Sequence, residues 1–298
     1  MVSNIVQYIR RDAGEWCRPT ARDEVDRSSS LCTEQPVVTT GDIAGVGIGV
    51  CAAGLEDAQR RGCPVPATQT DHAMDLDTGY AVQLHRQHLA VAAGERIAGY
   101  KIGLTSTSAQ LSFSAIEPIS GYLSATSVIG TGEPVCLSGL IEPKLEVELA
   151  FILGEDLDGR ATAADVWRAS AEVALSFEIV DSRWQGGVPT VAMLVADNSN
   201  AARAVIGQRV PISADLRRIQ VGLAIGDFRV EGHGENVMGD PAHAVAWLAM
   251  HLDGRGQRLM ADHIVLSGTL TAPVPVKPGD IAVADFGQFG HLSTSFSG

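Results

Sequence analysis

Two glutamates and a lysine alternate with apolar residues in one short segment of the chain. In residues 144–151, a period of two places Lys144, Glu146 and Glu148 on one face of a strand and four apolar side chains on the other. The two carboxylates then lie about 6–7 Å apart. Like charges at that distance repel unless water or a cation lies between them, and Mg²⁺ and Mn²⁺ prefer oxygen ligands. The segment predicts either a cation site or the solvated acidic face of a half-exposed strand.

A third glutamate lies in a run that is apolar enough to form an interior strand. Glu178 stands in residues 175–180, which read LSFEIV. A buried carboxylate costs several kcal/mol unless it is paired or bound to a metal, so the alternatives are a pair with Arg183 or a side chain that reaches the surface. Three acids on two strands, with no histidine or cysteine cluster nearby, favour an Mg²⁺ or Mn²⁺ site over a zinc site.

Lysine is rare in this chain, which makes Lys101 conspicuous. Only three of the 22 basic residues are lysines, and this one lies in GYKIGLTS at residues 99–106. A partly buried lysine beside a bound anion can donate a proton or hold a carboxylate, and we expect burial and positive neighbours to lower its pKa toward neutrality. The alternative is a lysine on the surface of a strand.

Small polar residues follow two further apolar runs. DNSN at residues 197–200 follows the run 191–196, and SGT at residues 267–269 follows the run 264–266. If both runs are strands, hydroxyl, amide and backbone N–H groups gather at strand ends, where an anionic substrate can bind. Each segment is also typical of an ordinary turn.

The remaining pattern predicts an α+β, mainly β fold. Residues 1–40 have no clear period and are predicted to be an extension that is loosely ordered or packs on a partner. Residues 41–98 predict a helical subdomain, with a second helix that begins after Asp77 and ends at Gly94. Residues 99–298 predict a mainly β domain that would carry the catalytic residues. Its expected strands are 100–104, 135–137, 145–153, 175–180, 220–225, 263–267 and 281–286, and its expected helices are 163–176 and 240–252.

Composition excludes several classes of protein. The 298 residues are 45% hydrophobic and 19% charged, which is enough for a substantial core. A net charge of −13 argues against nucleic acid or an acidic membrane surface as a partner. The longest near-apolar run, residues 43–55, is shorter than the ~20 residues of a membrane span, and no signal-peptide core is visible. We therefore expect a cytoplasmic protein that binds a small molecule.

Cysteine, glycine and histidine patterns add little chemistry. The five cysteines are odd in number and form no C-x-x-C pair, so we expect reduced thiols and neither a disulfide framework nor a zinc site. GVGIG at residues 45–49 lacks the third glycine of a dinucleotide-binding loop and is interpreted as a helix or turn. His85 and His88 are expected on a solvated helix face.

Five ordered blocks of sequence resemble the fumarylacetoacetate hydrolase superfamily, and within it the branch of 2-oxopent-4-enoate hydratases and 4-oxalocrotonate (2-oxo-3-hexenedioate) decarboxylases. The blocks are YKIGLTS at 100–106, PKLEVELA at 143–150, FEIVDSR at 177–183, VADNS at 195–199 and LSGTLT at 266–271. The resemblance runs from about residue 55 to residue 296 and implies rolled, mixed β-sheets with a helical N-terminal part.

The resemblance also implies a site. A divalent cation, Mg²⁺ or Mn²⁺, would be held by the acids that match Glu146, Glu148 and Glu178, and would chelate the 2-oxo and carboxylate oxygens of a 2-oxo acid substrate. Lys101 is similar to the family's active-site lysine. The candidate substrate-binding residues are Thr105, Ser106, Asp197, Ser199 and Thr269.

One departure from the family pattern bears on the reaction. Hydratases of this branch usually carry an acid in a P-D-F/Y-G block, where this chain has Ile119 in EPISG. Because Ile119 cannot transfer a proton, we expect a metal-dependent lyase that decarboxylates a vinylogous 2-oxo diacid such as 2-oxo-3-hexenedioate. The alternatives are a hydratase acting on 2-hydroxypenta-2,4-dienoate and a non-catalytic partner subunit, although the intact set of Lys101 and three glutamates argues against the latter. We expect a homo-oligomer, with a complex with a pathway partner enzyme as an alternative.

Overall fold

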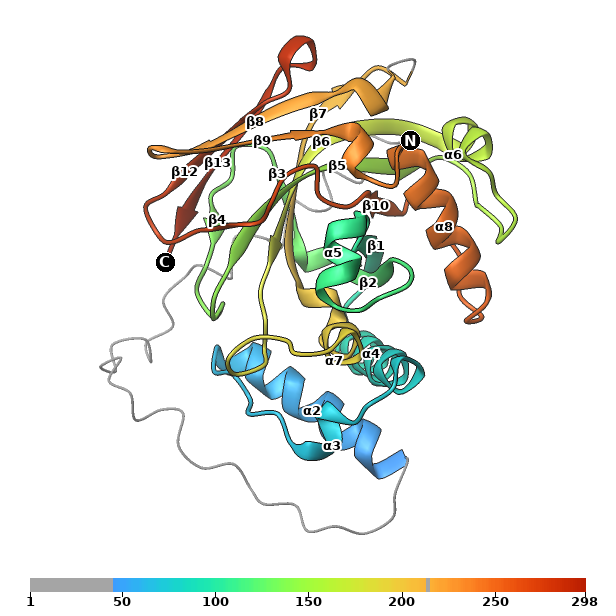
Figure 1. Cartoon of the computed structure of the whole chain (residues 1–298), viewed down its shortest axis with the longest axis vertical. Helices are drawn as coiled ribbons and strands as arrows, with labels where there is room; N and C mark the ends of the chain where they lie inside the picture. The colour runs from blue at the N-terminus through green and yellow to red at the C-terminus, as the bar shows by residue number, and fades with distance from the viewer. Residues whose placement is uncertain (1–44, 213–214) are drawn as a thin grey trace.

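The computed structural model describes residues 45–212 and 215–298. In Figure 1, strands make up most of the larger, upper part of the molecule. Helices α2, α3, α4 and α7 lie together in the lower part. These helices are α2 (Gly45–Arg61), α3 (Gln69–His72), α4 (Leu76–Ala92) and α7 (Val191–Ala196). The others are α5 (Thr107–Ser112), α6 (Ala163–Ala169) and α8 (Pro241–Asp253). Within the described ranges, no helix is both long and apolar enough to cross a membrane.

The larger of the two sheets is mixed and has eight strands. Its order is β2 (Ile119–Ser124), β1 (Ile97–Gly103), β10 (Ile264–Leu266), β5 (Lys144–Leu153), β6 (Ser170–Val180), β7 (Ala201–Val210) and β3 (Val128–Gly130), with β11 (Val274–Pro275) paired to β5. β1 runs parallel to β10, and β3 runs parallel to β7. The other pairs are antiparallel.

A second sheet and helix α8 complete the main core. The sheet has the order β4 (Val135–Cys136), β13 (His291–Ser297), β12 (Ile281–Asp285), β8 (Gln220–Ile225) and β9 (Phe228–His233). Buried side chains from both sheets and from α8, among them Phe177, Leu223 and Leu248, form one apolar cluster. The N-terminal part of the described chain is helical, and the sheets that follow are mixed and curved. This arrangement confirms the predicted α+β, mainly β fold.

The first helices agree with the sequence in type and differ in one boundary. The glycine-rich segment at residues 45–49 begins α2, as predicted. Helix α4 begins two residues earlier than predicted, because the carboxylate of Asp75, and not that of Asp77, accepts the free N–H of Thr78 at 2.8 Å. His85 and His88 are exposed on α4, which confirms their predicted place. The predicted extension, residues 1–40, lies outside the described residues, and the division of the chain at residue 98 stays a prediction.

Two predicted elements are wrong. The helix predicted for residues 163–176 ends at Ala169, where the Ser170 hydroxyl donates to the Val166 carbonyl, and the chain continues as β6 between β5 and β7. Strand pairing on both edges of β6 outweighs the helical period of its first half. The run at residues 191–196 is helix α7 and not a strand, because the Thr190 side chain caps it and all six side chains pack inside or near the core.

The cysteines differ from the expectation of reduced thiols only. Among the described residues Cys63 and Cys136 are disulfide-bonded, whereas Cys51 is free. Burial raises the pKa of the Cys51 thiol to about 12, with the nearby Asp71 adding to the shift. This thiol is therefore uncharged at neutral pH. An odd number of cysteines excludes complete pairing but does not exclude individual disulfides, so the expectation from the count was too strong.

Candidate active site

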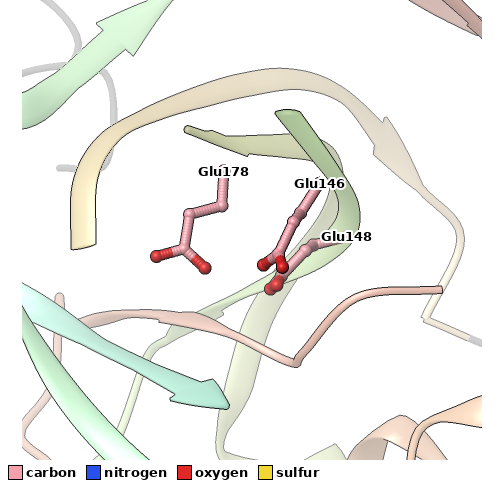
Figure 2. A group of neighbouring side chains, drawn as sticks. All are labelled: Glu146, Glu148 and Glu178. Atoms are coloured by element: carbon pink, nitrogen blue, oxygen red, sulfur yellow. The ribbon is translucent and has the colours of Figure 1, made fainter. Parts of the chain in front are cut away.

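Strands β5 and β6 place the acidic side chains in one block on one face of the large sheet. Glu146 lies opposite Glu178, and Glu148 lies opposite Ser176. Opposite residues, and residues two apart in one strand, point to the same face, so these four side chains share it. Figure 2 shows the carboxylates of Glu146 and Glu148 reaching toward that of Glu178. One oxygen of each of the three carboxylates lies within 4.8 Å of the others.

Lys101 reaches this block from strand β1. The row of paired residues Lys101, Leu266 and Ala150 crosses β1, β10 and β5, and places the lysine on the face of the glutamates. Its Nζ atom lies 3.2 Å from Oε2 of Glu178, and both side chains are buried. This pair excludes the alternatives in which Lys101 is a surface lysine or Glu178 pairs with Arg183.

The hydrogen bonds of the three carboxylates do not compensate for the free-energy cost of burying them. Glu148 and Glu178 are fully buried, and among the described residues Oε1 of each makes no hydrogen bond, while Oε2 of Glu178 has the ion pair with Lys101. Burial raises the pKa of all three glutamates, that of Glu178 to about 7. The charges of Glu178 and Glu146 raise the pKa of Glu148 further. In the absence of a bound metal ion, burial therefore disfavours the ionised form of the three glutamates, despite the ion pair with Lys101.

The pKa of Lys101 moves in the direction opposite to the prediction. Burial lowers it, but the charges of Glu178, Glu146 and Glu148 outweigh burial, and the net pKa lies above the ordinary value of a lysine. The prediction assumed positive neighbours, and the structure instead surrounds the ammonium group with acids. Lys101 is accordingly a stable cation at neutral pH.

A divalent cation fits the residues of this block. Unpaired buried carboxylate oxygens are costly, and the three ligand oxygens are near enough to one another for a single ion to bind all of them. Mg²⁺ and Ca²⁺ take oxygen ligands at about 2.0–2.6 Å. Three ionised carboxylates and one ammonium group leave two negative charges, which one divalent ion neutralises. A donor set of oxygens alone suits a hard cation better than zinc.

The loop after β10 holds Glu148 in place. The backbone N–H of Gly268 donates to Oε2 of Glu148 at 2.9 Å. Gly268 has a φ of +103°, and a Cβ atom there would lie 2.5 Å from the side chain of Thr105. Only glycine fits, and Thr105 therefore lies beside the acidic block. The sequence indicated backbone N–H groups in this SGT segment, and the structure shows which one contacts the site.

Three of the predicted substrate-binding hydroxyls hydrogen-bond within the chain. The Ser106 hydroxyl accepts the Ala109 N–H and caps α5. The Ser199 hydroxyl donates to the Ser120 carbonyl of β2 at 2.7 Å, and the Thr269 hydroxyl donates to the Thr271 carbonyl at 2.8 Å. These bonds shape the loops and strand edge around the site. Direct contact of these hydroxyls with a substrate stays a prediction.

Asp197 has a different role from the predicted one. One of its carboxylate oxygens accepts Nε of Arg183 at 2.6 Å and a guanidinium N–H of Arg86 at 3.0 Å, and the other accepts the Arg183 backbone N–H at 2.7 Å. All three side chains are buried. The carboxylate of Asp197 therefore binds two arginines. Through Arg86 it joins helix α4 to the segment that follows α7. Sequence reasoning missed Arg86, because its partner lies 111 residues away.

Substitution of Asp197 by alanine is expected to lower the free energy of unfolding by about 3–5 kcal/mol, since it removes the carboxylate that pairs with buried Arg183 and leaves Glu56 as the carboxylate partner of buried Arg86. Urea denaturation of the cation-free protein measures the change. The exposed Asp215, which pairs with Arg217 at the surface, is the matched control and should cost less than about 1 kcal/mol when replaced by alanine. Equal losses in the two variants would contradict the structural role of Asp197.

The raised pKa of Glu178 predicts a pH-dependent stability difference. A carboxyl group with a folded-state pKa near 7 and an ordinary pKa of 4.5 leaves the folded state uncharged at low pH and penalises it as the pH rises through this window. The free energy of unfolding of cation-free wild type, relative to the Glu178→Gln variant, should therefore fall between about pH 4.5 and about pH 7. The comparison cancels titrating groups that lie far from Glu178, and excess Mg²⁺ should abolish the fall. A relative stability that rises with pH would contradict the burial of this acid.

An apolar cluster borders the ammonium group. Ile119 of β2 is 1% exposed and lies opposite Gly103. Its Cγ1 atom and the Lys101 Nζ atom lie 3.2 and 3.5 Å, respectively, from the position that a Cβ atom on Gly103 would take. Ile119 packs with Tyr80, Leu194 and Val195. Ile119 thus places an apolar side chain near Lys101 on the β2 side.

Known proteins resemble this chain over most of its length. The family model described as the fumarylacetoacetate (FAA) hydrolase C-terminal matches residues 86–297. A 2-keto-4-pentenoate hydratase of Burkholderia vietnamiensis is 34% identical over 83% of this chain and 96% of its own length. The 2-keto-4-pentenoate hydratase 1 of Dechloromonas aromatica is 39% identical over 75% of this chain and 86% of its own length.

A solved structure shares the whole fold. The 4-oxalocrotonate decarboxylase from Pseudomonas putida G7, complexed with magnesium and adipate, superposes with a TM-score of 0.81 at 29% identity. The match covers 86% of this chain and 100% of that chain. The extent of the family match, together with the identity to these relatives, leads to one conclusion: this chain belongs to the fumarylacetoacetate hydrolase family, in the group that contains hydratases and decarboxylases of 2-oxo acids.

Proposed function

We propose that this chain is a divalent-cation-dependent lyase that decarboxylates a vinylogous 2-oxo diacid such as 2-oxo-3-hexenedioate. The buried block of Glu146, Glu148 and Glu178 next to Lys101 supports a lyase that needs a cation. Relatives named as hydratases and as a decarboxylase, the latter complexed with magnesium, support the same class of reaction. Mg²⁺ or Mn²⁺ is the proposed cofactor.

The three glutamates would hold the cation, and the bound cation would bind the 2-oxo and adjacent carboxylate oxygens of the substrate and make the 2-oxo group an electron sink. In the reaction the bond between C5 and the distal carboxylate carbon breaks. Its electron pair moves through the conjugated chain to the 2-oxo oxygen, CO₂ leaves, and the resulting dienolate takes up one proton. The glutamates stay ionised throughout and transfer no proton.

Lys101 supplies the positive charge and the proton. Its ammonium group lies 3.2 Å from Glu178, and in the cation-free protein three acids raise its pKa above that of an ordinary lysine. It can bind the anionic substrate and can return a proton to the dienolate. Negative charge accumulates on the 2-oxo oxygen as CO₂ leaves. The ammonium group of Lys101, held in a fixed position, would stabilise that charge and so favour decarboxylation.

Ile119 is the observation that favours decarboxylation over hydration. A carboxylate next to the apolar side chain of Ile119 would lose solvation, whereas neutral CO₂ would not. Addition of water to a dienoate needs a group that moves a proton to or from water. Ile119 has no such group, and its place beside Lys101 is consistent with the loss of CO₂.

Hydration is the second candidate, favoured by the sequence relatives. The relatives that are 34% and 39% identical to this chain are both named 2-keto-4-pentenoate hydratases. A hydratase would use the same cation and the same chelation of the 2-oxo acid, but would need a proton-transfer group in place of the acid that Ile119 replaces. The two reactions therefore differ in the substrate that the purified protein consumes.

Parallel assays separate these candidates. CO₂ release from 2-oxo-3-hexenedioate and consumption of 2-hydroxypenta-2,4-dienoate are measured with Mg²⁺ and again with a chelator. We expect Mg²⁺-dependent CO₂ release from the diacid. Hydration of the dienoate without CO₂ release would establish the hydratase, and CO₂ release that persists with chelator would contradict the cation. Inactivity on both substrates would contradict both candidates.

A further inference from the structure

The fourth position of the acidic block is a serine. Ser176 lies on β6 directly opposite Glu148 and two residues before Glu178, so its side chain shares the face of the glutamates. It is fully buried. The period of two that identified Glu146 and Glu148 applies equally to Ser176 and Glu178, and this is the signal by which the sequence could have revealed it.

Two polar atoms on this pair lack partners. Neither Oγ of Ser176 nor Oε1 of Glu148 makes a hydrogen bond among the described residues. The other oxygen of Glu148 is held by the Gly268 N–H, so the free oxygen is fixed in direction. A buried hydroxyl is almost always hydrogen-bonded, and an unpaired one next to a candidate ion site indicates a ligand that both groups contact.

Octahedral coordination suggests what that ligand is. Three carboxylate oxygens of the block and two oxygens of a 2-oxo acid would leave one position of an octahedral cation, and Mg²⁺ characteristically retains water. We propose that Ser176 is a further residue of the cation site, where its hydroxyl hydrogen-bonds a water molecule that also contacts the cation and Glu148. This inference rests on the proposed cation-dependent function.

A second serine on the same strand provides the contrast. The Ser170 hydroxyl is also buried, but it donates to the Val166 carbonyl at 2.7 Å and so has a structural role at the end of α6. Removal of the Ser170 hydroxyl leaves a buried carbonyl without its donor, which destabilises the fold. Removal of the Ser176 hydroxyl eliminates an unpaired polar atom, which does not destabilise the cation-free fold.

Titration of Mn²⁺ into the purified, substrate-free full chain tests the proposal, with wild type, Ser176→Ala and Ser170→Ala compared by calorimetry. We expect Ser176→Ala to weaken Mn²⁺ binding by about tenfold, since loss of a group that orients metal ligands typically has this effect. Its cation-free melting temperature should equal or exceed that of wild type. Ser170→Ala should show the reverse pattern, with unchanged Mn²⁺ affinity and a lower melting temperature.

Each of the other outcomes shows whether the inference about Ser176 or the proposed function is wrong. If wild type binds Mn²⁺ and Ser176→Ala binds it equally tightly, Ser176 is not part of the cation site and the inference is overturned, while the proposed function stands. If Ser176→Ala lowers the melting temperature without changing Mn²⁺ affinity, its role is structural and the inference is again overturned. If wild type binds no Mn²⁺, the proposed function itself is overturned.

Discussion

Replacement of Glu178 by glutamine is expected to lower kcat/KM by at least about 1,000-fold, which corresponds to about 4 kcal/mol of lost transition-state stabilisation. The amide keeps the size of the side chain but removes one of three charges that would hold the cation and also removes the partner of Lys101 at 3.2 Å. The cation-free variant should fold at least as stably as wild type, because burial of the Glu178 charge costs more than its ion pair with Lys101 offsets. Steady-state kinetics at saturating Mg²⁺ and thermal melting measure the two effects.

The same substitution on the surface is the matched control. Glu231 lies exposed on β9 in the second sheet, and Glu231→Gln should leave both kcat/KM and cation affinity unchanged. Full activity of Glu178→Gln at ordinary Mg²⁺ concentrations would contradict the proposed ligand. Activity that returns only at greatly raised Mg²⁺ would agree with a ligand that contributes affinity.

Replacement of Lys101 by methionine should separate catalysis from cation binding. We expect kcat to fall by about 10²–10⁴-fold, the usual contribution of a general acid. Cation affinity should rise or stay equal, because the ammonium group competes with the cation for the same three carboxylates. Methionine retains the apolar stem that fits beside Gly121, so a change in packing does not explain the loss. Single-turnover kinetics and calorimetric titration with Mg²⁺ provide the two readouts.

The exposed Lys277, which follows β11, is the control for Lys101. Lys277→Met removes the same charge from the chain and should change kcat by less than about threefold, since an exposed charge is screened by solvent. A Lys101→Met variant that loses cation affinity together with activity would show that the lysine supports the site structurally. A variant with unchanged kcat would exclude Lys101 from proton transfer and from substrate binding in the transition state.

The acidic block could be predicted from the sequence because strand periodicity is a local property. Alternation alone places Glu146 and Glu148 on one face, and the apolar run around Glu178 indicates a buried strand. These two local patterns need only strand pairing in register to produce the observed block. Helix α8, with Asp240 as its cap and Gly254 at its end, was predictable for the same reason.

Other features depend on which distant segments meet. The partner of Lys101 is 77 positions away, and three acids from two other strands reverse the direction expected for its pKa. Asp197 binds arginines from two other segments, although its sequence context is that of a loop. The apolar run of α7 fits a strand or a helix equally well until its neighbours are known. Tertiary contacts decide these features, and no local pattern contains them.

The most direct test of the cation site is a crystal of the full chain soaked with Mn²⁺ and measured at the manganese absorption edge. We predict one anomalous peak within about 2.0–2.6 Å of a carboxylate oxygen from each of Glu146, Glu148 and Glu178, the range typical of hard cations with oxygen ligands. A peak that lies elsewhere, or none at this block under conditions in which the protein is active, would contradict the assignment of these three glutamates as the ligands of the catalytic cation.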